Sequence, residues 1–352
     1  MIYLVIFLIL VVFSYADPRR LYWPLLIALY LFAAFRFETG CDWGGYLNQY
    51  LVQGALPFEE VLIDPEPLWN LVLYFQQAAG IRYPWLNIFA ATVFFVGIHQ
   101  IARRLRSPFS FLVFLFPILI INMPMSAIKQ ATAIGVLSFA YIAFTDKRVF
   151  RFVALVAIAS LIHNSAAIFL LLTPLVAGEI TKRRLFLAAI LAIPGMVALL
   201  GTAGAEQATE RYIEQDIDAA GALYRVLLLS MTGLAYLYMR NKGWLANGEA
   251  FRRLKHIGAM MMVACLVLLP VSTVIADRFG YYLIPIQAII LANFRYASLP
   301  HFPKLIIAAP YLILLLTFGV WTTYSNHFQL CYVPYESWLF GYPNSDMHNY
   351  RY

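Results

Sequence analysis

Apolar residues along this chain fall into blocks of about 15–20 residues, separated by short polar connections. Blocks of this length cross the hydrocarbon core of a bilayer when they are helical. Lipid offers backbone polar groups no partner, so the blocks are predicted to be helices. The alternating pattern that is typical of membrane barrels is absent. The predicted spans are 1–16, 21–35, 83–102, 108–123, 125–144, 150–162, 165–177, 184–201, 223–240, 257–275, 279–294 and 304–323.

Basic clusters between the blocks predict the orientation of the chain, because Lys and Arg concentrate in cytoplasmic connections. The clusters lie at 19–20, 103–106, 147–151, 182–184, 240–255 and 295–304. Most acidic residues lie in the other connections. We therefore expect an all-α polytopic chain, a single transmembrane domain over 1–352, with about twelve crossings and both ends outside. Its outer parts are loops 36–66 and 202–222 and the tail 324–352.

Two segments have ambiguous crossings. Segment 150–177 is apolar but has basic clusters on both sides, so a single crossing would place one cluster outside. We predict a broken hairpin of two short helices with His163-Asn164-Ser165 at its outer tip. Segment 67–80 is shorter than the roughly 20 residues that cross a bilayer as helix. A full crossing there would also place the basic residues 103–106 on the outer side. A re-entrant or interfacial helix is predicted instead.

The composition supports a membrane protein. Only 12% of the residues are charged, against roughly 25% in soluble domains, and mean hydropathy is +0.74. The net charge of +7 does not indicate nucleic acid as a partner, because the basic residues are scattered through short loops. The three cysteines lack metal-ligand spacing and the six histidines do not cluster, so we expect no metal and no cofactor.

Seven basic residues are not explained by the orientation rule and are predicted to lie at the outer end of the bundle. Charges within a membrane are costly and usually have a function or a partner. One alternative is snorkelling or structural ion pairing, and the other is a cationic pocket for an anionic substrate. The seven are Arg36, Arg82, Lys129, Arg211, Arg225, Arg278 and Arg351.

Other polar residues near these cations favour the pocket. Asp42 lies in a Gly-rich loop with Tyr46, and aromatic rings with carboxylates suit sugars, although single aromatics often form only an interfacial belt. Glu66 precedes Pro67 and is predicted to be either a helix cap or a catalytic carboxylate. His163 is either a structural histidine at a helix break or a functional one.

Cys41 and Cys331 are both predicted to lie outside. A disulfide between them is one alternative, and two free thiols are slightly favoured from the sequence.

Taken in order, these features resemble the EpsG family of bacterial exopolysaccharide and O-antigen (Wzy-type) polymerases over most of the chain. The motifs are Arg36 with 40–46, Glu66-Pro67-Leu68-Trp69, Lys129-Gln130, 161–166, Arg278 with Tyr281 and Tyr282, and Pro334-Tyr335. Cys41 stands where the family has Thr, and Lys129 stands where it has Arg. Lysine keeps the charge but lacks the bidentate fork, which weakens the expectation of a direct phosphate clamp at 129.

The resemblance implies a fold similar to the GT-C-like membrane glycosyltransferases and a metal-independent polymerase. Such an enzyme moves a growing glycan from an undecaprenyl diphosphate carrier to an incoming lipid-linked repeat unit. The implied location is the bacterial inner membrane with the site facing the periplasm. Implied partners are the lipid-linked oligosaccharide, membrane lipid and a chain-length regulator. A flippase of lipid-linked sugars, an O-antigen ligase and a membrane acyltransferase with His163 as base are the alternatives.

The resemblance implies roles for the candidate site residues. Developing negative charge on the diphosphate needs positive charge at the site. The expected base is one of Asp42, Glu66 and His163, with the first two ranked above the third. The expected diphosphate-binding residues are Arg36, Lys129, Gln130, Arg211 and Arg278. The expected sugar-binding residues are Tyr46, Tyr281, Tyr282 and Tyr335.

Overall fold

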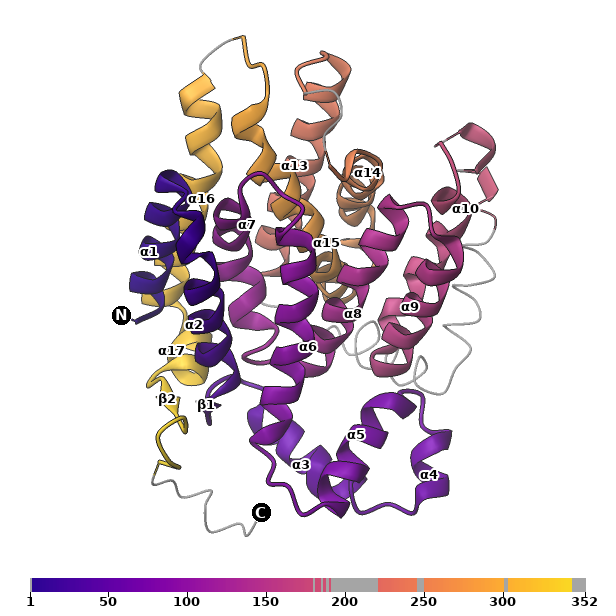
Figure 1. Ribbon diagram of the computed structural model, residues 1–352, viewed down its shortest axis with the longest axis vertical. Coiled ribbons are helices and arrows are strands. Elements are labelled where there is room, and N and C mark those ends of the chain that lie inside the picture. Colours follow the sequence, from indigo (N-terminus) through magenta and orange to yellow (C-terminus); the bar gives the residue numbers. More distant parts are fainter. Residues whose placement is uncertain are drawn as a thin grey trace.

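The computed structural model describes residues 2–179, 181–184, 186, 187, 190, 221–245, 250–300 and 303–343. Nearly all of its regular elements are helical (Figure 1). The first half contains α1 (Ile2–Ala16), η1 (Arg19–Leu21), α2 (Tyr22–Ala34), β1 (Arg36–Phe37), α3 (Trp43–Gln53), α4 (Phe58–Ile63), α5 (Pro67–Ala78), α6 (Trp85–Ala102), α7 (Pro108–Leu115), η2 (Phe116–Ile120), α8 (Ile128–Thr145) and α9 (Val149–Ile162). The second half contains η3 (Asn164–Leu172), α10 (Thr173–Val176), α13 (Ala222–Asn241), α14 (Arg252–Leu268), α15 (Thr273–Asn293), η5 (Phe294–Tyr296), α16 (Pro303–Tyr324), α17 (Asn326–Tyr332) and β2 (Glu336–Ser337).

Among the described residues, five helices are long and apolar enough to cross a membrane: α6, α8, α13, α15 continued through η5, and α16. Four shorter apolar helices cover 2–16, 108–120, 149–162 and 164–176. Every predicted span except 184–201 coincides with a helical element, and most of 184–201 lies outside the described residues. The predominantly helical, membrane-type architecture is confirmed, and the likeness to the GT-C-like glycosyltransferases stays a prediction. The number of twelve crossings stays a prediction.

The core of the bundle is built around α8, which packs against α6 and α9, and around α15, which packs against α13 and α14. Helices α6 and α8 approach closely because Gly97 faces Gly135. A Cβ at residue 97 would lie 2.1 Å from the carbonyl oxygen of Gly135, so larger side chains would push the helices apart. This contact fixes the start of α8, which carries part of the polar site.

The predicted basic connections meet at one end of the bundle. Arg104, after α6, pairs with Asp146, after α8, at 2.8 Å. Arg295, after α15, donates to the carbonyl oxygen of Ser14 near the end of α1 at 3.1 Å. Connections far apart in sequence therefore share one end, as the charge pattern predicts.

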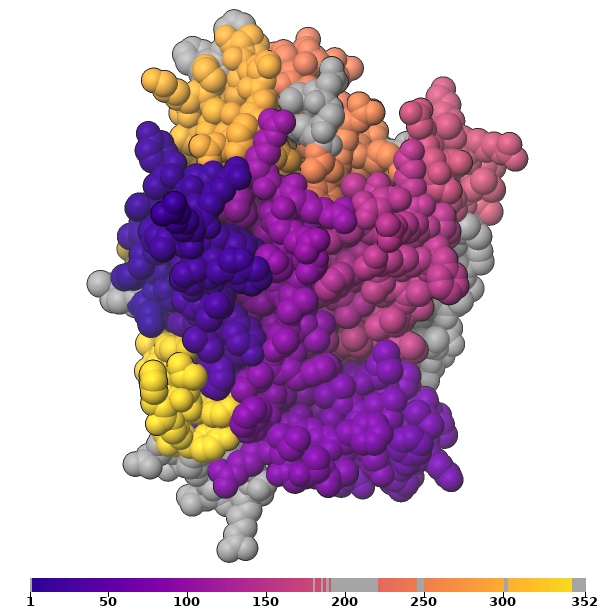
Figure 2. Space-filling model, viewed as in Figure 1, coloured from indigo at the N-terminus to yellow at the C-terminus, as the bar shows by residue number. Residues whose placement is uncertain are grey.

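The opposite end carries a layer of short helices, α3, α4 and α5, below the bundle (Figure 1). In the space-filling view this layer covers the lower end beside the C-terminal segment (Figure 2). Helix α5 contacts α3, α4 and α9. Its twelve residues span about 18 Å, and its place in the layer corresponds to the interfacial alternative for 67–80. Strands β1 and β2 pair antiparallel beside the layer.

The predicted hairpin is present between α9 and α10. Helix α9 ends at Ile162, and His163 is extended with φ −148° and ψ 111°. The returning arm packs against α9. It is a 3-10 helix over Asn164–Leu172 followed by one short α-helical turn, whereas the sequence predicted two α-helical arms. The break places the tip against the α3–α5 layer.

Candidate functional site

Glu66 is the centre of a polar cluster at this end. Its Oε2 lies 2.5 Å from Nζ of Lys129, and its Oε1 lies 2.7 Å from Nδ1 of His163. The backbone N–H of Asn164 donates to the same Oε1 at 3.0 Å. The side chains of Glu66 and His163 are each 14% exposed and that of Lys129 is 18% exposed. The cluster is therefore sheltered but still reachable.

Three separate elements position these groups. Glu66 is the last residue before α5, whose Pro67 starts the helix without needing a backbone donor. Lys129 lies in the first turn of α8, where exposed amides add positive potential. His163 lies at the break after α9. The local sequence therefore places each group at a helix end.

Electrostatics define the protonation of the Glu66–His163 pair. Burial alone would raise the pKa of Glu66, but the hydrogen bond and charge of His163 and the ammonium of Lys129 outweigh burial and lower it to about 2. Glu66 is thus an ionised acceptor. A carboxylate cannot donate, so Nδ1 of His163 carries the proton and Nε2 is the basic nitrogen.

Tyr46 and Gln130 connect this cluster to Arg278. The backbone N–H of Lys129 donates to the hydroxyl of Tyr46 at 3.3 Å. The side chain of Gln130 donates to the carbonyl oxygen of Arg278 at 2.8 Å, which joins α8 to α15. Arg278 is exposed, and Gln130, which holds it through this bond, is the residue after Lys129. Arg278 therefore lies beside the cluster.

The Asp42 loop lies on the other side of Tyr46. The hydroxyl of Ser126 donates to Oδ2 of Asp42 at 3.1 Å. Gly40 has φ +102°, and a Cβ there would lie 1.8 Å from the carbonyl oxygen of Met125. Only glycine allows this approach. Tyr46 lies within electrostatic range of Asp42, so the loop belongs to the same site.

A disulfide joins Cys41 to Cys331 in α17, with a Cα–Cα distance of 4.8 Å. The slight preference for free thiols was wrong, because the β1–β2 pairing brings both segments together. Within the described residues, Cys41, Cys331 and His327 form one group with potential metal-ligand atoms. Both sulfurs are in the disulfide, so this group has no thiolate to offer a metal.

A second polar layer lies behind the cluster. The hydroxyl groups of Ser165 and Tyr282 are 2.9 Å apart. Arg225 forms a bidentate ion pair with Asp277, at 2.6 and 2.8 Å, and lies 5.6 Å from the ring centre of Tyr281. No role was assigned to Asp277 from the sequence. The sequence did contain a hint of this ion pair. An arginine within a membrane usually requires a partner, and Asp277 lies at the start of a span.

The prediction that Arg36 binds the diphosphate is not supported. Its side chain is fully buried. Its guanidinium donates to the carbonyl oxygens of Pro124 and Thr39 and to Oδ1 of Asn87, and it lies over the ring of Trp43. Backbone carbonyls near the helix ends need donors, and Arg36 supplies them. Arg36 therefore supports the loop that carries Asp42.

The predicted sugar-binding tyrosines are mostly buried. Tyr46, Tyr281 and Tyr282 are at most 9% exposed, and Tyr335 stacks on Phe32 while its hydroxyl donates to the carbonyl oxygen of Phe32. Aromatic rings at the bundle end gain more from packing than from lining a path. The four tyrosines predicted to bind sugar therefore do not present open ring faces, and of their hydroxyls those of Tyr46 and Tyr282 contact groups near the cluster. Arg211 lies outside the described residues.

A model of the EpsG family matches residues 20–337 of the chain. The match includes every element that contributes a side chain to the cluster. No curated protein and no solved structure matches the chain.

Proposed function

Because this chain belongs to the EpsG family, we propose that it is a membrane glycosyltransferase that polymerises lipid-linked oligosaccharide repeat units. It transfers the growing glycan from undecaprenyl diphosphate to an incoming lipid-linked repeat unit. The observation that carries the proposal is the Glu66–His163 pair, with Lys129 and Arg278 beside it, at one end of an apolar bundle.

His163 is the base in this proposal, ahead of both carboxylates. Glu66 accepts from Lys129, His163 and the amide of Asn164, and its low pKa makes it a poor proton acceptor. Asp42 accepts from Ser126. The imidazole is oriented through Nδ1, so Nε2 takes the proton, as in other carboxylate–histidine pairs. Glu66 is then a positioning residue.

The reaction forms one glycosidic bond, breaks the bond to the diphosphate and transfers one proton. The acceptor hydroxyl oxygen attacks the anomeric carbon of the glycan on the carrier, and the hydroxyl proton moves to Nε2 of His163. The bond between the anomeric carbon and the diphosphate oxygen breaks, and the lipid diphosphate leaves with the electron pair. The leaving group is a weak base, so positive charge matters more than acid catalysis.

Arg278 is the main source of that charge. Lys129 is paired with Glu66 and so contributes a compensated charge. Arg278 is exposed beside the cluster, and its guanidinium can meet phosphate oxygens in a bidentate manner. In this scheme Arg278 supplies the charge that a metal supplies in other glycosyltransferases.

We assign the site to the periplasmic side of the inner membrane. The basic connections lie at the opposite end, where the positive-inside rule places the cytoplasm. The Cys41–Cys331 disulfide lies at the site end and is favoured in an oxidising compartment.

Purified chain incubated with lipid-linked repeat units tests the proposal. A polymerase produces a ladder of lipid-linked products that differ by whole repeat units. A flippase only moves the substrate between leaflets of a vesicle, and a ligase transfers finished polymer to lipid A without making a ladder. Either of those results without a ladder would overturn the proposal. Arg278→Ala should lose the ladder, and Arg82→Ala is its matched control. Arg82 is also a cation outside the basic connections, but it lies over Tyr342.

A further inference from the structure

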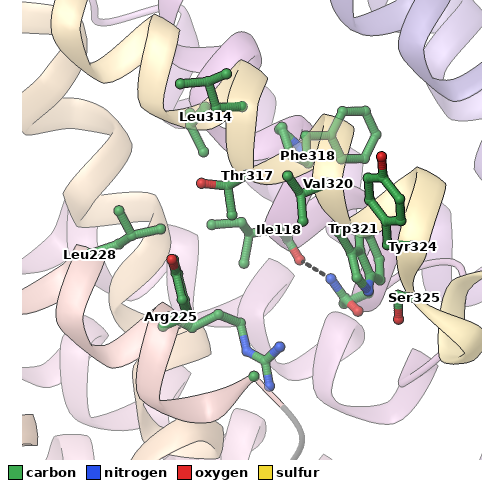
Figure 3. Close-up of a pocket in the computed structure, with 15 residues that line it drawn as sticks. Ile118, Arg225, Leu228, Leu314, Thr317, Phe318, Val320, Trp321, Tyr324 and Ser325 are labelled. Atoms are coloured by element: carbon green, nitrogen blue, oxygen red, sulfur yellow. Dashed lines mark hydrogen bonds between the residues drawn. The ribbon is translucent and has the colours of Figure 1, made fainter.

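An apolar groove runs along the outside of the bundle between η2, α13 and α16. Its largest part has a volume of about 480 Å³. Leu228, Leu314 and Phe318 are among the apolar residues that line it (Figure 3). Arg225 and Ser325 lie at its lower end in this view. The groove thus has a hydrocarbon-like wall and a polar end.

The groove continues toward the basic end of the bundle. A second cavity of about 240 Å³ shares Ile118, Leu228 and Leu314 with the first and reaches Ile306 on α16. From Ile306 to Ser325 the α16 segment covers about 28 Å at 1.5 Å per residue. The hydrocarbon core of a bilayer is about 30 Å thick, so the groove runs through nearly its full depth.

Within the described residues, α16 is mostly exposed beside the groove. Only 11% of its apolar window is buried, although its mean hydropathy is 2.1. Its main contacts in the described chain are with α1, α17 and η5 rather than with α13. A long chain in the membrane can therefore enter from the side between α13 and α16.

The polar end of the groove lies against the start of α15. Arg225 pairs with Asp277 and lies over Tyr281. The next residue, Tyr282, bonds Ser165, two residues after His163. The start of α15 thus contacts both the polar end of the groove and the hairpin that carries His163.

We propose that this groove binds the isoprenoid chain of a lipid-linked substrate, with its diphosphate beyond the Arg225 end, toward Arg278, which follows Asp277 at the start of α15. The inference rests on the proposed function. The depth of the groove favours an isoprenoid chain over a phospholipid acyl chain. An acyl chain covers only one leaflet, about half of the hydrocarbon core. A groove that spans both leaflets matches a chain longer than one leaflet.

The test uses a photoreactive polyprenyl diphosphate and the purified full chain in nanodiscs. Labelled peptides are expected from α13 and α16. Unlabelled undecaprenyl diphosphate should suppress this labelling, and added phosphatidylglycerol should not. Labelling outside the groove, or equal competition by phosphatidylglycerol, would overturn the inference.

Two groove-filling variants sharpen the result. Thr317→Trp and Ala309→Trp place bulk in the two halves of the groove and should each lower labelling about tenfold. Leu312→Trp is the control, since Leu312 is exposed on α16 but lines neither cavity. Wild-type labelling in both groove variants, with folding checked by gel filtration, would contradict the groove assignment. Groove labelling without any ladder would remove the proposed function and leave the groove as an isoprenoid site.

Discussion

Oε1 of Glu66 lies 2.7 Å from Nδ1 of His163, although 97 residues separate the two in the chain. The same oxygen accepts from the amide of Asn164, which the break after α9 leaves without a helical partner. One carboxylate therefore stabilises the broken helix and orients the imidazole. The acidic residue before α5 and the helix break after α9 are thus parts of one structural unit.

Replacement of Glu66 by Gln tests whether the ion pairs of Glu66 stabilise the fold, through the pH dependence of the melting temperature. Ionised Glu66 stabilises the folded state above the ordinary carboxyl pKa of about 4.5, and this stabilisation is lost as the pH falls toward its lowered pKa of about 2. The melting temperature of the wild type in detergent should therefore fall more between pH 4.5 and 2 than that of the variant. Parallel melting curves for the two proteins over this range would show that Glu66 is not held as an anion.

Arg278→Ala should abolish chain extension, with a loss of at least about 100-fold, while the amount of protein in the membrane stays normal. The reason is the loss of the main positive charge facing the leaving diphosphate. Arg278→Lys keeps the charge without the fork and should retain part of the activity. Polymer length is measured on gels of extracted glycan, and long polymer in cells with Arg278→Ala would remove Arg278 from the site.

Arg36→Met should reduce folded protein rather than activity per molecule. The change leaves Asn87 and two backbone carbonyls without donors, at about 1–3 kcal/mol for each buried group left unsatisfied. Gel filtration and melting temperature measure the loss, and activity is then normalised to folded protein. A stable variant without activity would restore Arg36 as a diphosphate ligand.

Cysteine labelling tests the orientation. In a background without Cys41, Cys265 and Cys331, Asn164→Cys should react with an impermeant maleimide from the periplasm, and Arg183→Cys should not. Asn164 lies at the tip of the hairpin, whereas Arg183 lies in the basic cluster that follows its returning arm. Reaction of both from the periplasm would contradict the hairpin and the assigned face.

Much of the fold follows from local chemistry that can be read from the sequence. Lipid forces each apolar block to satisfy its own backbone, so helices are predicted wherever such blocks occur. Charge on both sides of 150–177 likewise predicts the break near His163. Both rules depend only on neighbouring residues.

The contacts that define the site depend on distant residues and could not be predicted in the same way. Arg36 finds its acceptor at Pro124, 88 residues away, so a cation that looks available from sequence is fully buried. The orientation rule treats all unexplained cations alike, whereas the structure buries Arg36 and exposes Arg278. The order of the candidate bases changed for the same reason, since the partners of Glu66 are only visible in three dimensions.

The most direct test of the central claim compares wild type with His163→Asn in proteoliposomes supplied with lipid-linked repeat units. Asparagine can still donate to Glu66, so folding and substrate binding should persist, but it cannot take a proton. We predict a ladder of whole repeat units from the wild type and a loss of at least about 100-fold in the variant, with photolabelling by polyprenyl diphosphate unchanged. A ladder of wild-type intensity from His163→Asn would contradict the account.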